Sequence, residues 1–379
     1  MPHRPHLFEE FPPVSKAEWI AQIERDLKGK AIEDLDWSVG SLRFSPFHHL
    51  DDRTGAPSAL VVPAWEAAED IPAADLLEAN KLAHKAVGEG MESLRFLLSE
   101  PLGDHRMEGL IDGIDPLAVS LHFFEKNRNA EPLNLLRHLY HVLEKQHLDA
   151  TKVRGCLAWT TQAPVVEKDA MSLLGYVHDH LPGYKVLPVG VGLDWSNPQR
   201  TVENLAALLT GMDGWLASLT EAGFEPDTIH RHLFVLVGVS DNYFVGLATV
   251  RAVRMLGDHL ARAWGIESEH LFIDAYFSPF GQSEDPYRQL LAATTRAMAA
   301  IAGGANRLTI TPPDAIDPEH PMTEEESRHL VRNIHHILRL ESFFDAVSDP
   351  AAGSYFFEHL TERLAAAAWQ HFVDASREQ

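Results

Sequence analysis

The sequence has a single cysteine, Cys156, among its 379 residues, so it can form no internal disulfide. It also lacks an apolar run of about 18 residues, the length that a membrane-spanning helix needs, and its N-terminus has no apolar core of signal-peptide length. Basic residues are scarce, with 32 Lys and Arg against 55 Asp and Glu and a formal net charge of -23. So acidic a surface repels phosphate backbones and anionic lipid. We therefore expect a cytoplasmic protein that binds neither nucleic acid nor a membrane.

Common motifs for metals, nucleotides and nucleophiles are missing as well. The sequence contains no HExxH pattern, no GxGxxG or GxxxxGK[ST] loop and no GxSxG elbow. Among its 22 histidines, His138 and His141 lie three residues apart on one predicted helix, but a lone pair of this kind is more often solvated surface. The sequence therefore predicts no metal site.

Short apolar runs alternate with helical patterns along most of the chain. The runs cover residues 93–98, 117–124, 153–159, 185–191, 233–238, 271–276, 308–311 and, more weakly, 343–347. The clearest helical patterns cover residues 132–146, 202–222, 243–264, 287–302 and 324–341. Parallel strands covered on both faces read as such runs. The length and the number of repeats favour the α/β class and a closed (β/α)8 TIM barrel over an open sheet.

We assign the barrel to residues 64–379 and an N-terminal arm to residues 1–63. Residues 18–29 of the arm have apolar positions at helical spacing, and residues 37–47 are extended. An arm of this kind packs on a larger body or contacts another subunit.

Three further segments have more than one interpretation. The stretch DPAAGSYFFEHLT, residues 349–361, is interpreted as a strand-to-helix loop of the kind that lines the active face of a barrel, or as a plain surface turn. The Ser240-Asp241-Asn242 triplet could serve acid–base chemistry, although an Asp-Asn pair there is also a good helix N-cap. Arg251 and Arg254 are expected to form surface ion pairs, with phosphate contacts as the alternative.

Several segments resemble, in the same order along the chain, the acyl-CoA-binding barrel of the methylmalonyl-CoA mutase family. They are FPPVSKAEWIAQIERDLKGKAIEDLDW (11–37), GVSDNYFVGLATVRAVRML (238–256), DPYRQLLAATTRAMAAIAGG (285–304), residues 333–341, and DPAAGSYFFEHLT (349–361). The stretch ANKLAHKAVGEGMESLRFLL, residues 79–98, looks most like the small, non-catalytic subunit of that family.

Departures from the catalytic form of the family fall in its substrate-contacting segments. Where the catalytic form has the Arg and Tyr of a WTIRQYAGF-like segment, this chain has Ala68 and Asp70. The place of the histidine in GYHMQEAG lies within residues 190–199, which contain no Tyr or His, and AYFSPFG (275–281) stands where an HTSGWSL-like stretch is expected. The chain reaches Gln379 soon after the predicted last helix, so we expect no cobalamin-binding domain with its DxHxxG-type ligand.

The resemblance therefore implies a small-subunit-like component of a cobalamin-dependent acyl-CoA mutase. On this hypothesis the chain has no catalytic residues, binds no cofactor by itself and stabilises a catalytic partner that holds adenosylcobalamin. The alternative is the barrel subunit of an active mutase, a carbon-skeleton isomerase that uses a separate cobalamin-binding subunit. A homodimer and a stand-alone acyl-CoA-binding module also remain open.

Any surviving pocket is expected at the carboxyl ends of the strands. The candidates for this degenerate pocket are Trp65, Asp70, Asp194, Trp195, Asp241, Asn242, Tyr276 and Ser278. For each of them, packing or loop capping is the simpler interpretation.

Overall fold

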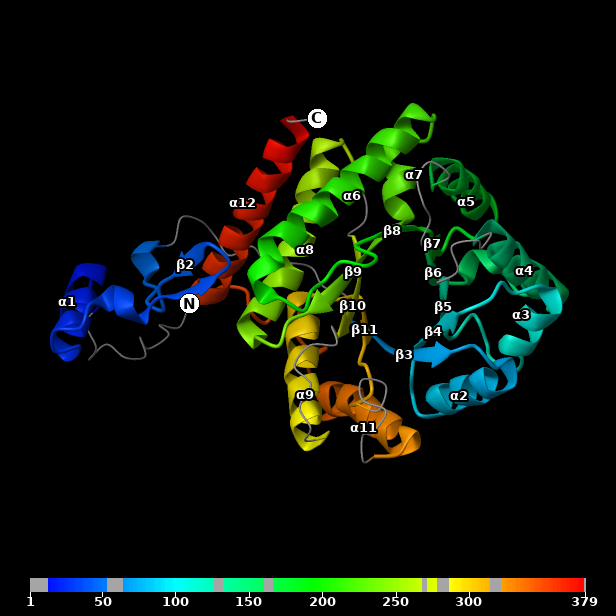
Figure 1. Cartoon of the computed structure of the whole chain (residues 1–379), viewed down its shortest axis with the longest axis horizontal. Coiled ribbons are helices and arrows are strands. Elements are labelled where there is room, and N and C mark those ends of the chain that lie inside the picture. The colour runs from blue at the N-terminus through cyan, green and yellow to red at the C-terminus, as the bar shows by residue number, and fades with distance from the viewer. Residues whose placement is uncertain are drawn as a thin grey trace, which may run out of the picture.

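The computed structural model describes residues 13–52, 64–125, 132–159, 166–267, 271–277, 286–313 and 322–377. Parallel strands form a barrel at its centre, and helices surround it (Figure 1). The barrel strands are β3(Glu66–Pro72), β4(Ser93–Leu98), β5(Ser120–Glu125), β6(Gly155–Trp159), β7(Tyr184–Lys185), β8(Leu187–Val189), β9(Leu233–Val239), β10(Phe272–Phe277) and β11(Arg307–Thr309). The helices that follow are α2(Leu76–Gly88), α3(Asp104–Leu110), α4(Pro132–Lys145), α5(Val166–His180), α6(Thr201–Glu221), α7(Pro226–Arg231), α8(Tyr243–Ala263), α9(Pro286–Gly303), α11(Glu324–His336) and α12(Tyr355–Arg377).

The barrel closes through one interrupted strand. Its described strands follow the order β7-β6-β5-β4-β3-β11-β10-β9-β8. The two end strands, β7 and β8, are separated in the chain by Val186 alone, and the N–H of Val186 donates to the carbonyl oxygen of His232 at 2.9 Å. Because β7 pairs with β6 and β8 pairs with β9, the two act as one strand and join the ends of the sheet. The predicted (β/α)8 barrel is confirmed.

Alternation along each strand separates an inner core from an outer one. On β9, Val235 and Val237 belong to the large cluster between strands and helices, whereas Phe234 and Leu236 point into the lumen. The lumen cluster also contains Cys156 from β6. Both faces of β9 are buried, which explains why the strand reads as a continuous apolar run.

The first and last predicted barrel strands need correction. The first strand is β3, which the apolar pattern missed because Glu66, Glu69 and Asp70 interrupt it. The weak run at residues 343–347 is not a strand. It follows a π-helix, η5(Ile337–Glu341), and its Phe343 and Val347 are 65% and 60% exposed.

The described part of the arm packs on the C-terminal helix. It consists of α1(Lys16–Asp26), the hairpin β1(Trp37–Val39)–β2(Leu42–Phe44) and two short 3-10 turns, η1(Ile32–Leu35) and η2(Leu50–Asp52). Ser15 and Glu18 form a capping box that starts α1. Trp37 stacks on Phe356 of α12 with ring centroids 5.6 Å apart. Figure 1 shows α1 beyond this contact, at the far end of the arm from the barrel.

The loop at residues 349–361 does not follow a strand, so its predicted place on the active face is wrong. It connects η5 to α12 and packs against the middle of α8. There Arg251, fully buried, donates from Nη2 to Asp349 Oδ2 at 2.8 Å and from Nη1 to Thr361 Oγ1 at 3.2 Å. Arg254 is equally buried, and its Nη2 donates to the Gly304 carbonyl oxygen at 2.6 Å. The expectation of surface ion pairs for both arginines is therefore also wrong: they fix the outer layer of the barrel.

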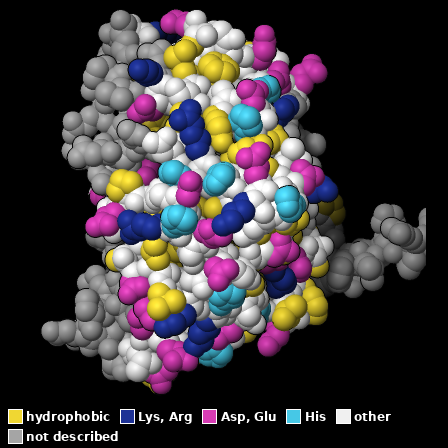
Figure 2. All heavy atoms as spheres, turned by 90° about the vertical axis from the view of Figure 1, so that its right-hand side faces the viewer, with side chains coloured by type: hydrophobic (Ala, Val, Ile, Leu, Met, Phe, Trp, Pro, Cys, Tyr) yellow, Lys and Arg dark blue, Asp and Glu magenta, His cyan; other side chains and the backbone are white. Residues whose placement is uncertain are grey.

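Helices α2 to α5 form the right-hand side of the molecule in Figure 1. Figure 2 shows that basic, acidic and histidine side chains are interspersed over this face without a large apolar area. In the described part of the chain, no helix is both long and apolar enough to span a membrane.

Candidate functional site

Four charged side chains cross the barrel lumen and form what we call the lumen network. Arg95 of β4 binds Asp70 of β3 through two hydrogen bonds, Nε to Oδ1 at 2.8 Å and Nη2 to Oδ2 at 2.9 Å. Its Nη1 reaches Asp274 of β10 at 3.1 Å, and Arg307 of β11 binds the other oxygen of Asp274 at 2.8 Å. Asp274 therefore bridges two arginines, and Arg95 bridges two aspartates.

Three members of the network, Arg95, Asp274 and Arg307, are buried, and Asp70 is half-buried. Asp274 and Arg307 are 1% and 0% exposed. Burial alone would lower the pKa of Arg95, but Asp70 and Asp274 outweigh it and raise that pKa above its ordinary value. Arg307 also donates from Nε to Ser93 Oγ at 2.7 Å and from Nη1 to Thr309 Oγ1 at 2.9 Å, whereas its buried Nη2 has no hydrogen-bond partner among the described residues.

Apolar side chains fill the lumen beside the network. They come from facing strands and comprise Cys156, Ala158, Phe234 and Leu236, with Phe124, Val191, Phe272 and Tyr276 packed against them. The described part of the lumen is thus a packed core of mixed polarity, as in other closed barrels of this size.

The amino-terminal half of the lumen is polar as well. His122 of β5 is 2% exposed, and its Nε2 lies 4.0 Å from Glu66 Oε2. Burial, followed by the nearby Arg307, lowers the pKa of His122 well below its usual range, so the ring is neutral. Burial raises the pKa of Glu66 despite its neighbours Arg154 and Arg307. Because burial disfavours the charged form of both His122 and Glu66, this pair is a poor binding site for an anion or a cation.

Two of the sequence candidates, Asp70 and Tyr276, meet at the carboxyl end of the barrel, around Arg95. Asp70 accepts from Arg95, and Tyr276 lies at the end of β10. Burial raises the pKa of Tyr276 to about 12, with Asp274 and Asp194 adding to the shift and Arg95 opposing it. Tyr276 is therefore protonated at neutral pH, and its phenol is a possible hydrogen-bond donor at the mouth of the barrel.

The loop after β8 brings Asp194 and Trp195 over the end of β9. Asp194 Oδ1 accepts from the Ser196 N–H at 2.9 Å, and hydrogen bonds to Ser196 lower its pKa. Trp195 is 5% exposed and packs on Gly238, where an added Cβ would lie 2.5 Å from the Trp195 Cβ. A glycine is needed at this strand position for Trp195 to pack there.

Asp241 and Asn242 serve the helix that follows β9. Asn242 Oδ1 accepts from the N–H groups of Phe244 and Val245 at 3.0 and 3.2 Å, so the capping interpretation is confirmed for Asn242. Asp241 forms an ion pair with Arg296 of α9. Both side chains therefore hold α8 and α9 in place.

The two remaining candidates do not join the group. Trp65 precedes β3 and therefore lies at the amino end of the barrel, which makes its predicted place at the carboxyl end wrong. Its Nε1 donates to His335 Nδ1 at 3.2 Å, and the Arg339 guanidinium lies 4.6 Å from its ring centroid. Ser278 lies outside the described residues.

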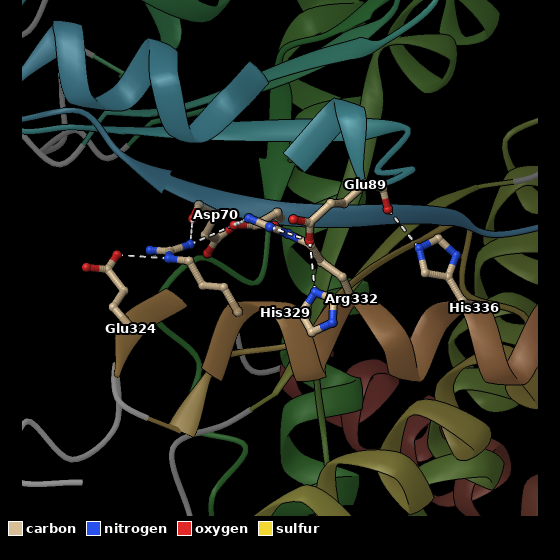
Figure 3. Close-up of polar contacts among 8 residues, drawn as sticks. Asp70, Glu89, Glu324, His329, Arg332 and His336 are labelled. Atoms are coloured by element: carbon tan, nitrogen blue, oxygen red, sulfur yellow. Dashed lines mark hydrogen bonds and ion pairs between the residues drawn. The ribbon is translucent and has the colours of Figure 1, made fainter. Parts of the chain in front are cut away.

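A second charged cluster lies on the outer face of β3, where α11 crosses it (Figure 3). Arg332 binds Glu69 through Nε at 2.6 Å and Nη2 at 2.8 Å, and it reaches Glu89 with Nη1 at 2.8 Å. Arg328 donates from Nη1 to Glu69 Oε1 at 2.8 Å and to the Asp70 carbonyl oxygen at 3.1 Å. We call this the α11 clamp. The adjacent residues Glu69 and Asp70 thus have separate roles. Glu69 binds α11 on the outer face of β3, and Asp70 binds the lumen network on the inner face.

Sequence reasoning missed Arg95, Asp274, Arg307 and Glu69. Arg95 and Asp274 are lone charges inside the apolar strands SLRFLL and FIDAYF, and Arg307 begins β11, whereas Glu69 lies among other acidic residues in EAAEDIP. A charge in such a position must be paired, so this signal could have identified the network. Within the described residues, no group of three His, Cys, Asp or Glu side chains is arranged to hold a metal ion.

Fold and site together define a closed (β/α)8 barrel whose described lumen contains its own ion pairs beside an apolar cluster. Comparison with known proteins gives the family: the model described as methylmalonyl-CoA mutase matches residues 104–378. The chain belongs to the methylmalonyl-CoA mutase family.

Relatives match over nearly the whole chain. A protein named methylmalonyl-CoA mutase small subunit from Porphyromonas gingivalis is 29% identical over 97% of this chain and 63% of its own length. The protein of the same name from Streptomyces virginiae is 25% identical over 98% of this chain and 65% of its own length. The mitochondrial methylmalonyl-CoA mutase of Macaca fascicularis is 24% identical over 93% of this chain and 54% of its own length. The chain therefore spans less than two thirds of the length of these relatives.

Proposed function

We propose that this chain is a non-catalytic barrel subunit that stabilises a catalytic mutase subunit, with adenosylcobalamin bound by the partner or the complex. The observation that carries the proposal is the lumen network. A mutase has to aim hydrogen-bond donors at the thioester oxygen of its substrate. In this barrel Arg95 donates to Asp70 and Asp274 instead, and Arg307 donates from Nη1 to Asp274.

The proposal assigns adenosylcobalamin to the partner or the complex. The cofactor would supply radical chemistry when it is bound. In the family that this chain resembles, a separate cobalamin-binding domain carries the histidine ligand, so the proposal requires no cofactor contact from the described barrel. We therefore assign no reaction step on the cofactor to this chain.

The arm supports the existence of a partner. Along α1 the apolar residues Trp19, Ile20 and Ile23, with Leu27 at the C-cap, lie at helical spacing, and among the described residues each of them is only half-buried. An amphipathic helix whose apolar face is only partly covered normally gains further contacts from another surface. The small-subunit names of two relatives agree with a larger partner.

One observation favours the alternative, an active barrel that uses a separate cobalamin-binding subunit. Tyr276 keeps its proton up to a pKa of about 12 and stands near Arg95 at the mouth of the barrel. A phenol there could donate to a substrate carbonyl. In that case, addition of a cobalamin-binding mutase domain to this chain would produce turnover of an acyl-CoA.

The first test measures thermal unfolding of the chain alone, with methylmalonyl-CoA, and with methylmalonyl-CoA plus adenosylcobalamin. A ligand at 100 times its dissociation constant would add about 2.7 kcal/mol to the stability of the native state. The proposal expects no shift of the melting temperature with either addition. A clear shift with methylmalonyl-CoA alone would show a working pocket and would favour the active-barrel alternative.

A further inference from the structure

An apolar pocket of about 240 Å³ lies on the outside of the barrel, away from the lumen. Its walls come from α8, α9, α12 and the loop after η5, and include Tyr243, Leu247, Ala302, Phe344 and Phe357. A pocket lined in this way accepts an apolar side chain and offers few polar groups to hold a small polar ligand.

The rim of this pocket exposes large apolar side chains. Leu340, Phe343 and Val347 are 65%, 65% and 60% exposed, and the last two also line the pocket. Singly exposed apolar residues are common, but several around one concave site mark a contact surface. We call residues 340–347 the apolar rim.

The backbone of the rim is strained at Phe343. The π-helix η5 ends here, and Phe343 takes the left-handed conformation with φ 55°. Glycine usually occupies such a position at a helix end, because a Cβ raises the energy of this conformation. A phenylalanine with most of its side chain in solvent gains little inside the monomer to offset that cost. We therefore expect the side chain of Phe343 to gain its contacts from another molecule.

Charge selects the occupant. Glu341 and Asp345 flank Phe343 and are exposed, and neither has an ion-pair partner among the described residues. The rim contains no Lys or Arg. A second copy of this chain would bring the same two carboxylates to the interface and would be repelled. A partner that offers an apolar side chain flanked by Lys or Arg would be attracted.

The pocket is also continuous with the arm. Phe357 of its wall lies 5.6 Å from Phe356, measured between ring centroids, and Phe356 stacks on Trp37 of the arm. Phe244, 47% exposed, lies 5.2 Å from Phe356 by the same measure. An aromatic strip thus joins the pocket to the segment that the proposed function assigns to the partner contact.

We propose that the pocket and its apolar rim are the docking site for the catalytic mutase subunit, which inserts an apolar side chain flanked by basic residues. This inference rests on the proposed function. Phe343 and Val347 supply the apolar edge of the contact, and Glu341 and Asp345 pair with the basic residues at its border.

The test uses the full chain and the methylmalonyl-CoA mutase large subunit of the same organism as probe. Affinity is measured by isothermal titration for the wild type, Phe343→Gly, Val347→Ser and the control Leu291→Ser, whose side chain is 69% exposed on α9 outside the rim. We expect a loss of roughly tenfold or more for both rim variants and no change for the control. Phe343→Gly should also keep or raise the melting temperature of the isolated chain, because it relieves the left-handed strain.

The outcomes separate the docking site from the proposed function. If the wild type binds and both rim variants bind equally well, the docking site is wrong and the proposed function stands. If the wild type does not bind the large subunit, both are wrong. If sedimentation shows that the isolated chain forms dimers that Phe343→Gly dissociates, the occupant is a second copy, which overturns the proposed partner.

Discussion

At the scale of single residues, the buried charges explain most of what the sequence could and could not predict. Asn242 was predictable as a cap, because its role depends on neighbours two and three residues away. Arg251 was not, because its partners Asp349 and Thr361 lie 98 and 110 residues further along the chain. Local chemistry can be read from local sequence, whereas a buried ion pair depends on tertiary contacts.

His335 of α11, which is buried against Trp65 at the amino end of β3, makes the stability of the protein depend on pH. Burial, with Arg339 next, lowers the pKa of His335 from 6.5 to about 3. Between these values only the unfolded chain takes up the proton, so stability falls as the pH drops below 6.5 and this loss levels off near 3. From pH 7 to pH 5.5 the wild type should therefore lose about 1 kcal/mol more than His335→Gln.

Urea unfolding at both pH values measures this difference. His371→Gln is the matched control, because His371 is exposed on α12. The unfolding free energy of the control should change with pH as that of the wild type does. Equal pH dependence of His335→Gln and the wild type would contradict the assignment.

At the scale of elements, periodicity predicted the long amphipathic helices and most strands, but it failed for β3. Its sequence EAAEDIP looks like a polar segment, and only the side chains of other elements make it a buried strand. Glu69 faces Arg328 and Arg332 on α11, while Asp70 faces Arg95 in the lumen. The weak run at 343–347 failed for the opposite reason: its apolar residues Phe343 and Val347 are exposed.

Removal of one charge from the α11 clamp should loosen α11 before the rest of the barrel. Glu69→Gln removes the buried carboxylate that Arg328 and Arg332 share. The two arginines keep only their more exposed partners Glu324 and Glu89, and loss of a buried partner costs about 3–5 kcal/mol. Hydrogen exchange by mass spectrometry should show reduced protection over residues 324–341, with smaller changes in α4 and α5.

Glu324→Gln provides the comparison within the same helix. Glu324 pairs with Arg328 from the surface, with its side chain 56% exposed, so its loss should cost at most about 0.5 kcal/mol. Uniform loss of protection throughout the chain in Glu69→Gln would show that the clamp does not act locally.

At the scale of the whole molecule, net charge opposes compactness. The chain carries -23 at pH 7, and its major internal ion pairs lie inside the protein, where salt does not reach them. An increase from about 10 to 150 mM NaCl shortens the screening length from roughly 30 to 8 Å and should raise the melting temperature. Differential scanning calorimetry at pH 7 tests this, and the effect should shrink near the sequence pI of 5.3.

A melting temperature that falls with added salt at pH 7 would contradict the conclusion that self-repulsion outweighs attraction between surface charges. Surface pairs such as Lys145–Glu108 would then contribute more than self-repulsion removes.

The closed barrel also has a consequence for the order in which the chain is synthesised. β3 pairs with β11, and Glu69 finds Arg332 only 263 residues later, so the first strand waits at the edge of a growing sheet for most of translation. Unpaired strand edges are prone to join other chains, and charged side chains on an edge prevent this. Until the C-terminal segment leaves the ribosome, Glu66, Glu69 and Asp70 would keep that edge hydrated. We therefore expect the acidic residues that made β3 hard to predict to reduce aggregation of the nascent chain before they form the ion pairs of the finished barrel.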